Sequence, residues 1–167
     1  MTKLPINRLE KSTFDVYGEV VEHEGKVQKR MLHTPFSSTG KNALAYQFSV
    51  NRLKRSMGQK ILIDTLERHP HSAQTFIPLT HSRHLVVVAL STKEGGLQTE
   101  TLKAFITNGS QGVSYHPGVW HFAFTSVDED SNVAVILGLT GKGDDTEYVD
   151  IPTSVVVPLT EECMFNL

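Results

Sequence analysis

The sequence predicts an all-β protein, a sandwich or barrel of many short strands with only minor peripheral helices. In several segments apolar and polar residues alternate with the period of two that is typical of strands. Glycine, proline and asparagine separate these segments, as at 93–96, 108–109 and 116–118. Short strands at this spacing, without long amphipathic helices between them, favour packed sheets over an α/β fold.

Two segments illustrate the strand patterns. Ala43–Val50 alternates, with its large apolar side chains on one side of the chain. Leu85–Leu90 is continuously apolar, as expected of a strand that is buried on both faces. The same patterns predict further strands at Lys60–Glu67, Gln74–Leu79, Thr101–Ile106, Val119–Thr125, Val133–Leu139 and Glu147–Ile151.

Two segments could form short helices. Leu9–Tyr17 could be capped by Ser12 or Thr13, and Asn51–Gln59 carries basic residues without a clear apolar stripe. We expect both to be peripheral. Gly141–Asp145 is typical of a solvated loop before the last strand.

Length and composition indicate one globular domain, residues 1–167. The chain is 39% hydrophobic and 20% charged, unlike a disordered protein. A net charge of −2 attracts neither nucleic acid nor an anionic membrane. No apolar run approaches the roughly 20 residues that span a bilayer.

A reducing, cytosolic setting fits the sequence best. Met1–Lys11 lacks the apolar segment of a secretory signal, and the single cysteine, Cys163, cannot form an internal disulfide. No base lies near Cys163 in sequence, so we do not expect it to be a nucleophile.

The first candidate functional segment is Glu67–Gln74, which contains a carboxylate, two histidines and an amide. In an extended chain Glu67 and His69 project to the same face, because side chains two apart share a face. His71 would join them if Pro70 does not turn the chain, and its role is open. Gln74 could reach the same space from the next strand.

The second candidate segment is Gly112–His121, in which the turn at 117–118 separates two strands. Along Val119–Thr125 the bulky Trp120, Phe122 and Phe124 would take one face. His121 would then lie beside Ala123 on the other face, where there is room for a ligand.

These two segments resemble the two cupin motifs, G-x5-H-x-H-x(3,4)-E-x6-G and G-x5-P-x-G-x2-H-x3-N. Gly112, Gly118 and His121 match the second motif, whereas Pro117 and Thr125 depart from it. In the first motif, Glu67 stands at the first histidine, His69 at the second and Gln74 at the glutamate. The resemblance implies a cupin-like double-stranded β-helix, a jelly-roll barrel, and a possible metal site of Glu67, His69, Gln74 and His121.

A longer set of phrases resembles the ureidoglycolate lyases over about positions 10 to 125. Phe122-Ala123 and Pro117 depart from the family pattern beside the presumed site. The phrases are Phe14–Gly18, Ser49–Arg52, Leu66–Pro70, Gln74–Pro78, Leu85–Ala89, Ala104–Gly109 and Gly118–His121.

This resemblance implies a homodimeric carbon–nitrogen lyase (amidine-lyase) that cleaves ureidoglycolate to glyoxylate and urea in allantoin degradation, a part of purine and nitrogen metabolism. The family also implies a divalent metal, nickel in particular. The reaction needs a base for the hydroxyl proton, a proton for the leaving urea and a cation for the substrate carboxylate.

Several residues have suitable side chains for these roles. Glu67, His69 and His121 could transfer protons, because histidine titrates near neutral pH and burial can raise the pKa of a carboxyl toward it. If these residues hold a metal, Tyr115 or His116 would move the proton instead.

For the substrate carboxylate we expect Arg52, whose guanidinium can bind two oxygens, with Lys103 as the second choice. Both could instead be solvated strand charges, just as Gln74, Tyr115 and His116 could be packing or turn residues.

Two alternatives to the lyase remain open from the sequence. The chain could be a cupin enzyme acting on a related small hydroxy acid, or a non-catalytic cupin that binds a small hydroxy or keto acid. The remaining histidines are expected to be hydrogen-bonded core or surface residues: His23, His33, His81 and His84.

Overall fold

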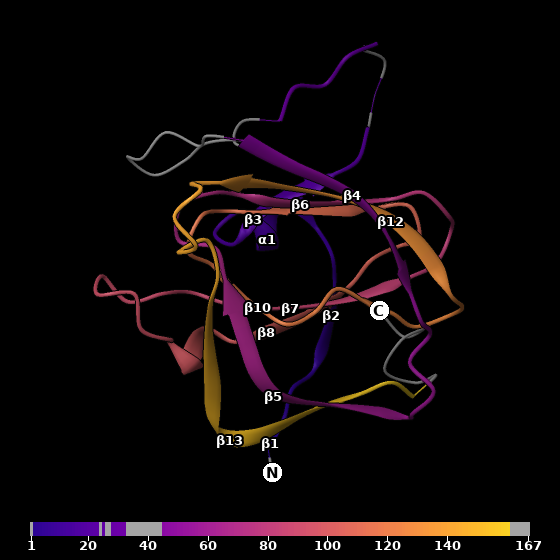
Figure 1. Cartoon of the computed structure of the whole chain (residues 1–167). Helices are drawn as coiled ribbons and strands as arrows, with labels where there is room; N and C mark the ends of the chain where they lie inside the picture. Colours follow the sequence, from indigo (N-terminus) through magenta and orange to yellow (C-terminus); the bar gives the residue numbers. More distant parts are fainter. Residues whose placement is uncertain (1, 24, 26–27, 33–44, 161–167) are drawn as a thin grey trace.

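The computed structural model describes residues 2–23, 25, 28–32 and 45–160 (Figure 1). Within them the chain forms two β-sheets, one α-helix and one 3-10 helix. The predictions for Ala43, Leu44, His33 and Cys163 lie outside the described residues. The predicted all-β class is confirmed: the strands pack as two layers, and one of the sheets curls into a half-barrel.

The smaller sheet has five strands and forms the upper layer in Figure 1. Its order is β3 (Gly18–Val21), β9 (Gly112–Tyr115), β6 (Gln74–Pro78), β12 (Ser131–Leu139) and β4 (Ala45–Leu53).

The larger sheet curls beneath the smaller one, so that β5, β13 and β1 lie at the bottom of Figure 1. A further strand, β11 (Thr125–Ser126), pairs with β7. The main order is β1 (Thr2–Lys3), β13 (Glu147–Pro158), β5 (Lys60–Arg68), β10 (Trp120–His121), β7 (His84–Ala89), β8 (Lys103–Ile106) and β2 (Ile6–Arg8).

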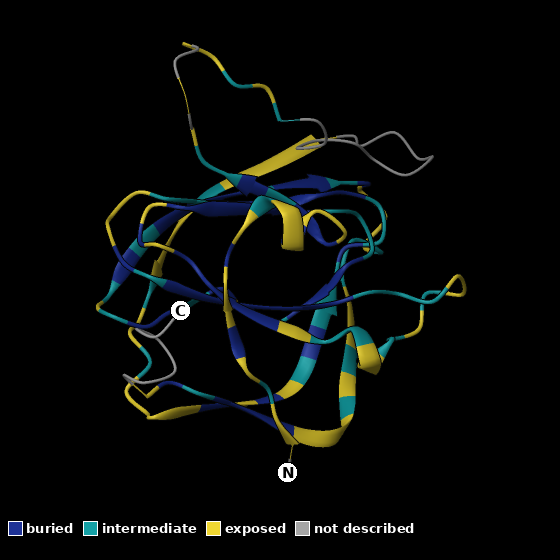
Figure 2. Ribbon diagram, turned by 180° about the vertical axis from the view of Figure 1, so that it is seen from behind, coloured by how far each residue is buried: buried dark blue, intermediate teal, exposed yellow. Residues whose placement is uncertain are grey.

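Strand β7 separates two hydrophobic cores, which explains its uninterrupted apolar sequence. Leu85, Val87 and Ala89 pack inside the curl of the larger sheet. Val86 and Val88 face the central core between the two sheets. All six residues of β7 are buried, as predicted for a strand covered on both faces (Figure 2).

The helix α1 (Lys11–Phe14) lies below β3, between the layers (Figure 1). Phe14 is completely buried there, and its ring meets the ring of Phe105 edge-on, with centroids 5.5 Å apart. It also contacts the rings of Tyr17 and Tyr115. The helix therefore closes one side of the central core with an aromatic plug. No side chain caps its start at Glu10, so the expected cap by Ser12 or Thr13 is not formed.

Two predicted elements differ in the structure. The predicted helix Asn51–Gln59 is wrong: Asn51–Leu53 continue β4, because this segment pairs with β12 as far as Leu53. The predicted strand Val119–Thr125 divides into β10 and β11. Across this break Trp120 packs inside the curl and Phe124 in the central core, so these two rings do not share one face.

His84 is a buried core histidine, as predicted, at the start of β7. Its ring stacks on Phe124, with centroids 4.4 Å apart, and its Nε2 lies 2.8 Å from the Ser131 hydroxyl. Burial lowers the pKa of His84 to about 4. The ring is therefore neutral in the folded protein at pH 7.

This depressed pKa predicts a loss of stability in mild acid. Below about pH 6.5 the unfolded chain binds a proton at His84 that the folded protein does not, so stability falls from there down to about pH 4. A shift of this size corresponds to about 3 kcal/mol. We expect His84→Gln, which cannot titrate, to flatten this part of the curve in urea unfolding at pH 4.5 and 7.5. An equal acid sensitivity in the variant and the wild type would contradict this.

No helix among the described residues is long and apolar enough to span a membrane.

Candidate active site

Two cross-strand pairs, one from each sheet, build the candidate active site. On the larger sheet Glu67 of β5 lies directly opposite His121 of β10. On the smaller sheet Gln74 of β6 lies opposite Tyr115 of β9. His69 follows the end of β5, where the chain crosses from one sheet to the other. The topology thus joins the two sequence segments at one place.

Glu67, His69 and His121 form a compact triad. Each offers a ligand atom, and these three atoms lie within 4.8 Å of one another. The two imidazole rings have centroids 5.4 Å apart. Tyr115 stacks on His121, with centroids 4.3 Å apart and a 24° angle between the rings. The prediction that Glu67 and His69 share a face is confirmed.

Each of the two imidazole rings is held in a fixed orientation by a backbone carbonyl. His69 Nδ1 lies 2.9 Å from the carbonyl oxygen of Asp145, and His121 Nδ1 lies 2.9 Å from that of Val119. A carbonyl only accepts hydrogen bonds, so each Nδ1 carries the proton in the neutral ring. The lone pair of each ring is then on Nε2, inside the site.

Four buried polar atoms in the site have no hydrogen-bond partner among the described residues. His69 Nε2, His121 Nε2, Gln74 Oε1 and the Tyr115 hydroxyl are buried without a well-formed hydrogen bond. His121 Nε2 is 3.4 Å from Glu67 Oε1, which is a long contact between two atoms that both carry lone pairs. A proton or a metal ion between them would satisfy both.

This donor set fits a divalent metal ion. Two imidazole nitrogens, one carboxylate and one amide oxygen are ordinary ligands of first-row transition metals. The carbonyl acceptors on Nδ1 are the partners that orient ligating histidines in metalloproteins. The structure therefore supports a site able to bind a metal.

The electrostatics distinguish the roles of the site residues. Contact with the His121 ring holds the pKa of the Glu67 carboxyl below its usual range, outweighing the effect of burial. The expectation that burial raises this pKa is wrong, and Glu67 is ionised at neutral pH. Burial lowers the pKa of His69 and raises that of Tyr115. Tyr115 therefore keeps its proton and can donate a hydrogen bond.

A hollow of about 210 Å³, open to the surface, is lined by two members of the triad, Glu67 and His121, but not by His69. Ala123 lies in its wall with His121, so the room predicted beside this histidine exists. Tyr148 of β13 pairs with Glu67 across the strands and lines the same hollow. The wall is lined by Asp64, Thr65, Leu66, Glu67, His121, Phe122, Ala123 and Tyr148.

The structure does not bring His116 and Arg52 to the triad. His116 Nε2 contacts the carbonyl oxygen of Asp15 near the surface, at 2.9 Å. Arg52 lies exposed on β4, where Asp130 binds both Arg52 and Lys54. Neither the predicted proton-transfer role of His116 nor the predicted carboxylate-binding role of Arg52 is supported by its position.

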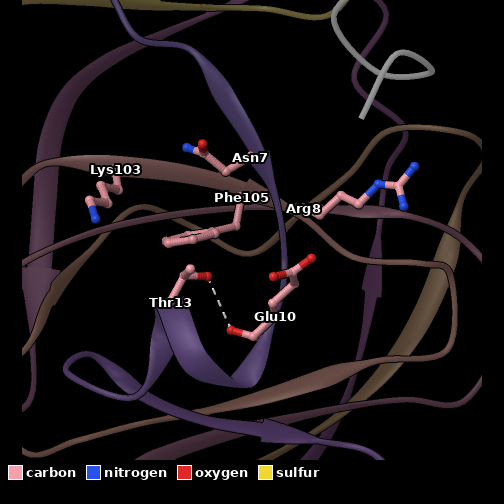
Figure 3. A pocket seen from close by; sticks show the side chains of 6 residues that line it. All are labelled: Asn7, Arg8, Glu10, Thr13, Lys103 and Phe105. Atoms are coloured by element: carbon pink, nitrogen blue, oxygen red, sulfur yellow. Dashed lines mark hydrogen bonds between the residues drawn. The ribbon is translucent and has the colours of Figure 1, made fainter.

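Lys103 lies at a different hollow, shown in Figure 3. It pairs with Val88, which in turn pairs with His121, so a full strand separates Lys103 from the triad. In Figure 3 Lys103 and Arg8 lie on opposite sides of this second hollow, whose lining residues are Asn7, Arg8, Glu10, Thr13, Lys103 and Phe105.

Sequence reasoning recognised Gly118 as a motif glycine but missed Asp145 and Tyr148 beside the triad. Gly118 has a φ of +81°, a conformation that favours glycine, and its amide donates to the carbonyl of His69 at 2.8 Å. Asp145 and Tyr148 come from a segment that looked like a solvated loop and from the strand after it. Both residues are far from Glu67 in the sequence, so no local pattern indicates that they lie beside it.

Comparison with known proteins supports one family for the whole fold. The family model described as Ureidoglycolate lyase matches residues 1–158. The chain belongs to the ureidoglycolate lyase family. The match extends well beyond position 125, where the recognisable phrases end, and includes β12, β13 and the loop between them.

Relatives within this family are similar over nearly their full length. A protein named Ureidoglycolate lyase from Salmonella typhimurium is 32% identical over 164 residues, covering 90% of this chain and 96% of the relative. One of the same name from Salmonella newport is 32% identical over 161 residues, with the same coverage. Among solved structures, RmlC from Streptococcus suis in complex with dTDP-D-xylose is 13% identical, with a TM-score of 0.40 over 55% of this chain and 42% of that one.

Proposed function

We propose that this protein is a ureidoglycolate lyase, which cleaves ureidoglycolate to glyoxylate and urea in allantoin degradation. The observation that carries the proposal is the Glu67, His69 and His121 triad, two members of which line an open hollow, in a chain of this family. The family match does not favour a non-catalytic or differently specific cupin. A cytosolic location and a single-domain protomer belong to the same proposal.

Glu67, His69 and His121 would hold a divalent metal, with Gln74 as a fourth ligand, and nickel is the first ion to test. The bound ion supplies positive charge for the hydroxyl and carboxylate oxygens of the substrate. This charge is needed at the site because none of the described residues lining the hollow is a lysine or arginine.

The protein's own groups account for the proton movements. Glu67 is ionised, and the carboxylate oxygen that does not bind a metal would accept the proton of the substrate hydroxyl as the carbon–nitrogen bond breaks. We thus assign this role to Glu67, not to the Tyr115 or His116 expected from the sequence for a metal site. The proton taken up by Glu67 would pass to the leaving ureido nitrogen, while the Tyr115 hydroxyl keeps its own proton and would donate a hydrogen bond to that nitrogen. The stacked rings of Tyr115 and His121 keep both groups in a fixed position.

The direct experiment combines a metal analysis with an assay. Protein purified without chelator should contain a divalent metal and release glyoxylate and urea in equal amounts from fresh ureidoglycolate. Chelator treatment should remove the activity, and added nickel, manganese or zinc should restore it. No glyoxylate with any of these ions would refute the lyase. Thermal stabilisation by glyoxylate or oxalate without turnover would instead indicate a binding cupin.

We also propose that two copies associate through the edge strand β4. Tyr46, Phe48 and Val50 project from it with 54%, 69% and 61% of their surface exposed. An exposed apolar edge strand pairs readily with a second chain, and the same strand in another copy is self-complementary. The alternation of β4, recognised in the sequence as one apolar face, would then serve an interface and not the core.

Changing Phe48 to glutamate tests this interface. Sedimentation should show a dimer for the wild type at micromolar concentration and a monomer for Phe48→Glu, because a buried unpaired carboxylate opposes association. Leu62→Glu changes another exposed apolar residue, on β5 of the other sheet, and should remain dimeric. A monomeric wild type, or a dimeric Phe48→Glu variant, would contradict the proposal.

A further inference from the structure

Two chain segments cross between the sheets beside the active site, and they are fastened to each other. Residues 69–73 connect β5 to β6, and residues 140–146 connect β12 to β13. Ser72 donates its hydroxyl to the Gly138 carbonyl at 2.9 Å. His71 Nε2 lies 3.2 Å from an Asp144 carboxylate oxygen. The site is thus located where two connections meet.

The second crossing forms a closed turn around Thr140. The Thr140 hydroxyl donates to Asp144 at 2.6 Å, and the Thr140 amide donates to the Asp145 carboxylate at 2.7 Å. The Lys142 amide contacts the same hydroxyl at 3.2 Å. These hydrogen bonds fix the backbone of the turn, including Asp145, whose carbonyl contacts His69.

This turn holds His69 by two contacts. The Asp145 carbonyl lies 2.9 Å from His69 Nδ1, and the Thr146 hydroxyl lies 3.2 Å from the same atom. His69 is 4% exposed, so water does not readily replace these partners. The orientation of a ligand imidazole in the site therefore depends on the position of a turn 76 residues away in sequence.

We propose that Asp144 is a positioning residue for the active site. Its carboxylate ties the turn to His71, and this tie keeps the Asp145 carbonyl on His69 Nδ1. His69 then has its proton on Nδ1 and its free lone pair on Nε2, toward Glu67 and His121. Asp144 itself contacts neither substrate nor the reacting atoms. Its effect on catalysis rests on the lyase proposed above, whereas its effect on His69 does not.

Partners of ligating histidines have measurable effects, because loss of such a partner lowers metal affinity about 10- to 100-fold. If His71 and Asp144 were instead an ordinary surface ion pair, their contact would contribute almost nothing to stability. The side chains of His71 and Asp144 are 18% and 40% exposed, so the pair is more enclosed than a typical surface pair. Because Asp144 contacts both Thr140 and His71, we favour the interpretation that it joins the two connecting segments.

The test compares Asp144→Ala with Asp144→Asn in the full chain. Asparagine keeps one oxygen that can accept from the Thr140 hydroxyl, and its amide nitrogen can donate to an unprotonated His71 Nε2, whereas alanine removes both contacts. Glu100→Ala is the control, because it removes an exposed carboxylate from the 3-10 helix Thr99–Thr101. Nitrogen-15 NMR of the metal-free proteins reports the His69 tautomer, calorimetry with nickel(II) chloride reports the affinity, and steady-state assays report kcat and KM.

We expect Asp144→Ala to change the His69 resonances toward a mixture of tautomers and to weaken nickel binding about 10- to 100-fold. Asp144→Asn should retain most of both properties, and Glu100→Ala should match the wild type. Unchanged His69 signals and nickel affinity in Asp144→Ala would overturn the proposal. A changed tautomer in a protein without any lyase activity would support the positioning role and reject the proposed function alone.

Discussion

Replacement of His121 by alanine is expected to lower kcat/KM for ureidoglycolate by about 10³-fold. The change removes an imidazole whose Nε2 faces Glu67 and whose ring supports Tyr115. It also removes one of the three groups able to bind a metal. A coupled glyoxylate assay measures the rate, and calorimetry with nickel measures the loss of affinity.

The matched control is His116→Ala, since both histidines lie in the second motif. His116 is bonded to the Asp15 backbone and lies outside the triad, so its removal should change kcat/KM by no more than about threefold. A large loss at His116 would show that this histidine takes part in the reaction despite its place outside the triad.

His121 is buried, so its removal could also weaken the fold. Glu67→Gln offers a second variant of equal size that removes only the charge. It should lose a comparable part of the activity while its melting temperature stays close to that of the wild type. Full activity in Glu67→Gln would contradict the role assigned to the triad.

Replacement of Phe14 by alanine is expected to destabilise the protein by about 3–5 kcal/mol. The ring is fully buried between the sheets and contacts Phe105, Tyr17 and Tyr115. Its removal leaves a cavity that rigid strands on either side cannot readily fill. Urea unfolding followed by circular dichroism measures the free energy of unfolding.

Val16→Ala is the matched control, two positions further along the chain. Val16 is 56% exposed, so its truncation should change the free energy of unfolding by no more than about 0.5 kcal/mol. Equal effects of the two substitutions would show that α1 does not plug the central core.

The sequence by itself determined the all-β class and most strands, because alternation is a local consequence of the pleat. β5, β7 and β12 follow their patterns closely. β4 was placed almost correctly, but its last residues have no strand pattern of their own. They extend because β12 supplies pairing partners as far as Ser131, a non-local cause that a sequence window cannot show.

The sequence also determined the reactive part of the candidate site. Glu67 and His69 are two apart on one face, and the glycine spacing before His121 matches a known motif. These are short-range relations within extended chain, and the structure retains them.

Only the tertiary structure decided which other residues reach the triad. Gln74 and Tyr115 arrive because β6 and β9 pair in one register, and Asp145 arrives because one crossing loop lies against another. The same long-range pairing put Arg52 on an exposed edge and Lys103 at another hollow. Registers and loop contacts of this kind depend on the packing of the two sheets, so no local pattern encodes them.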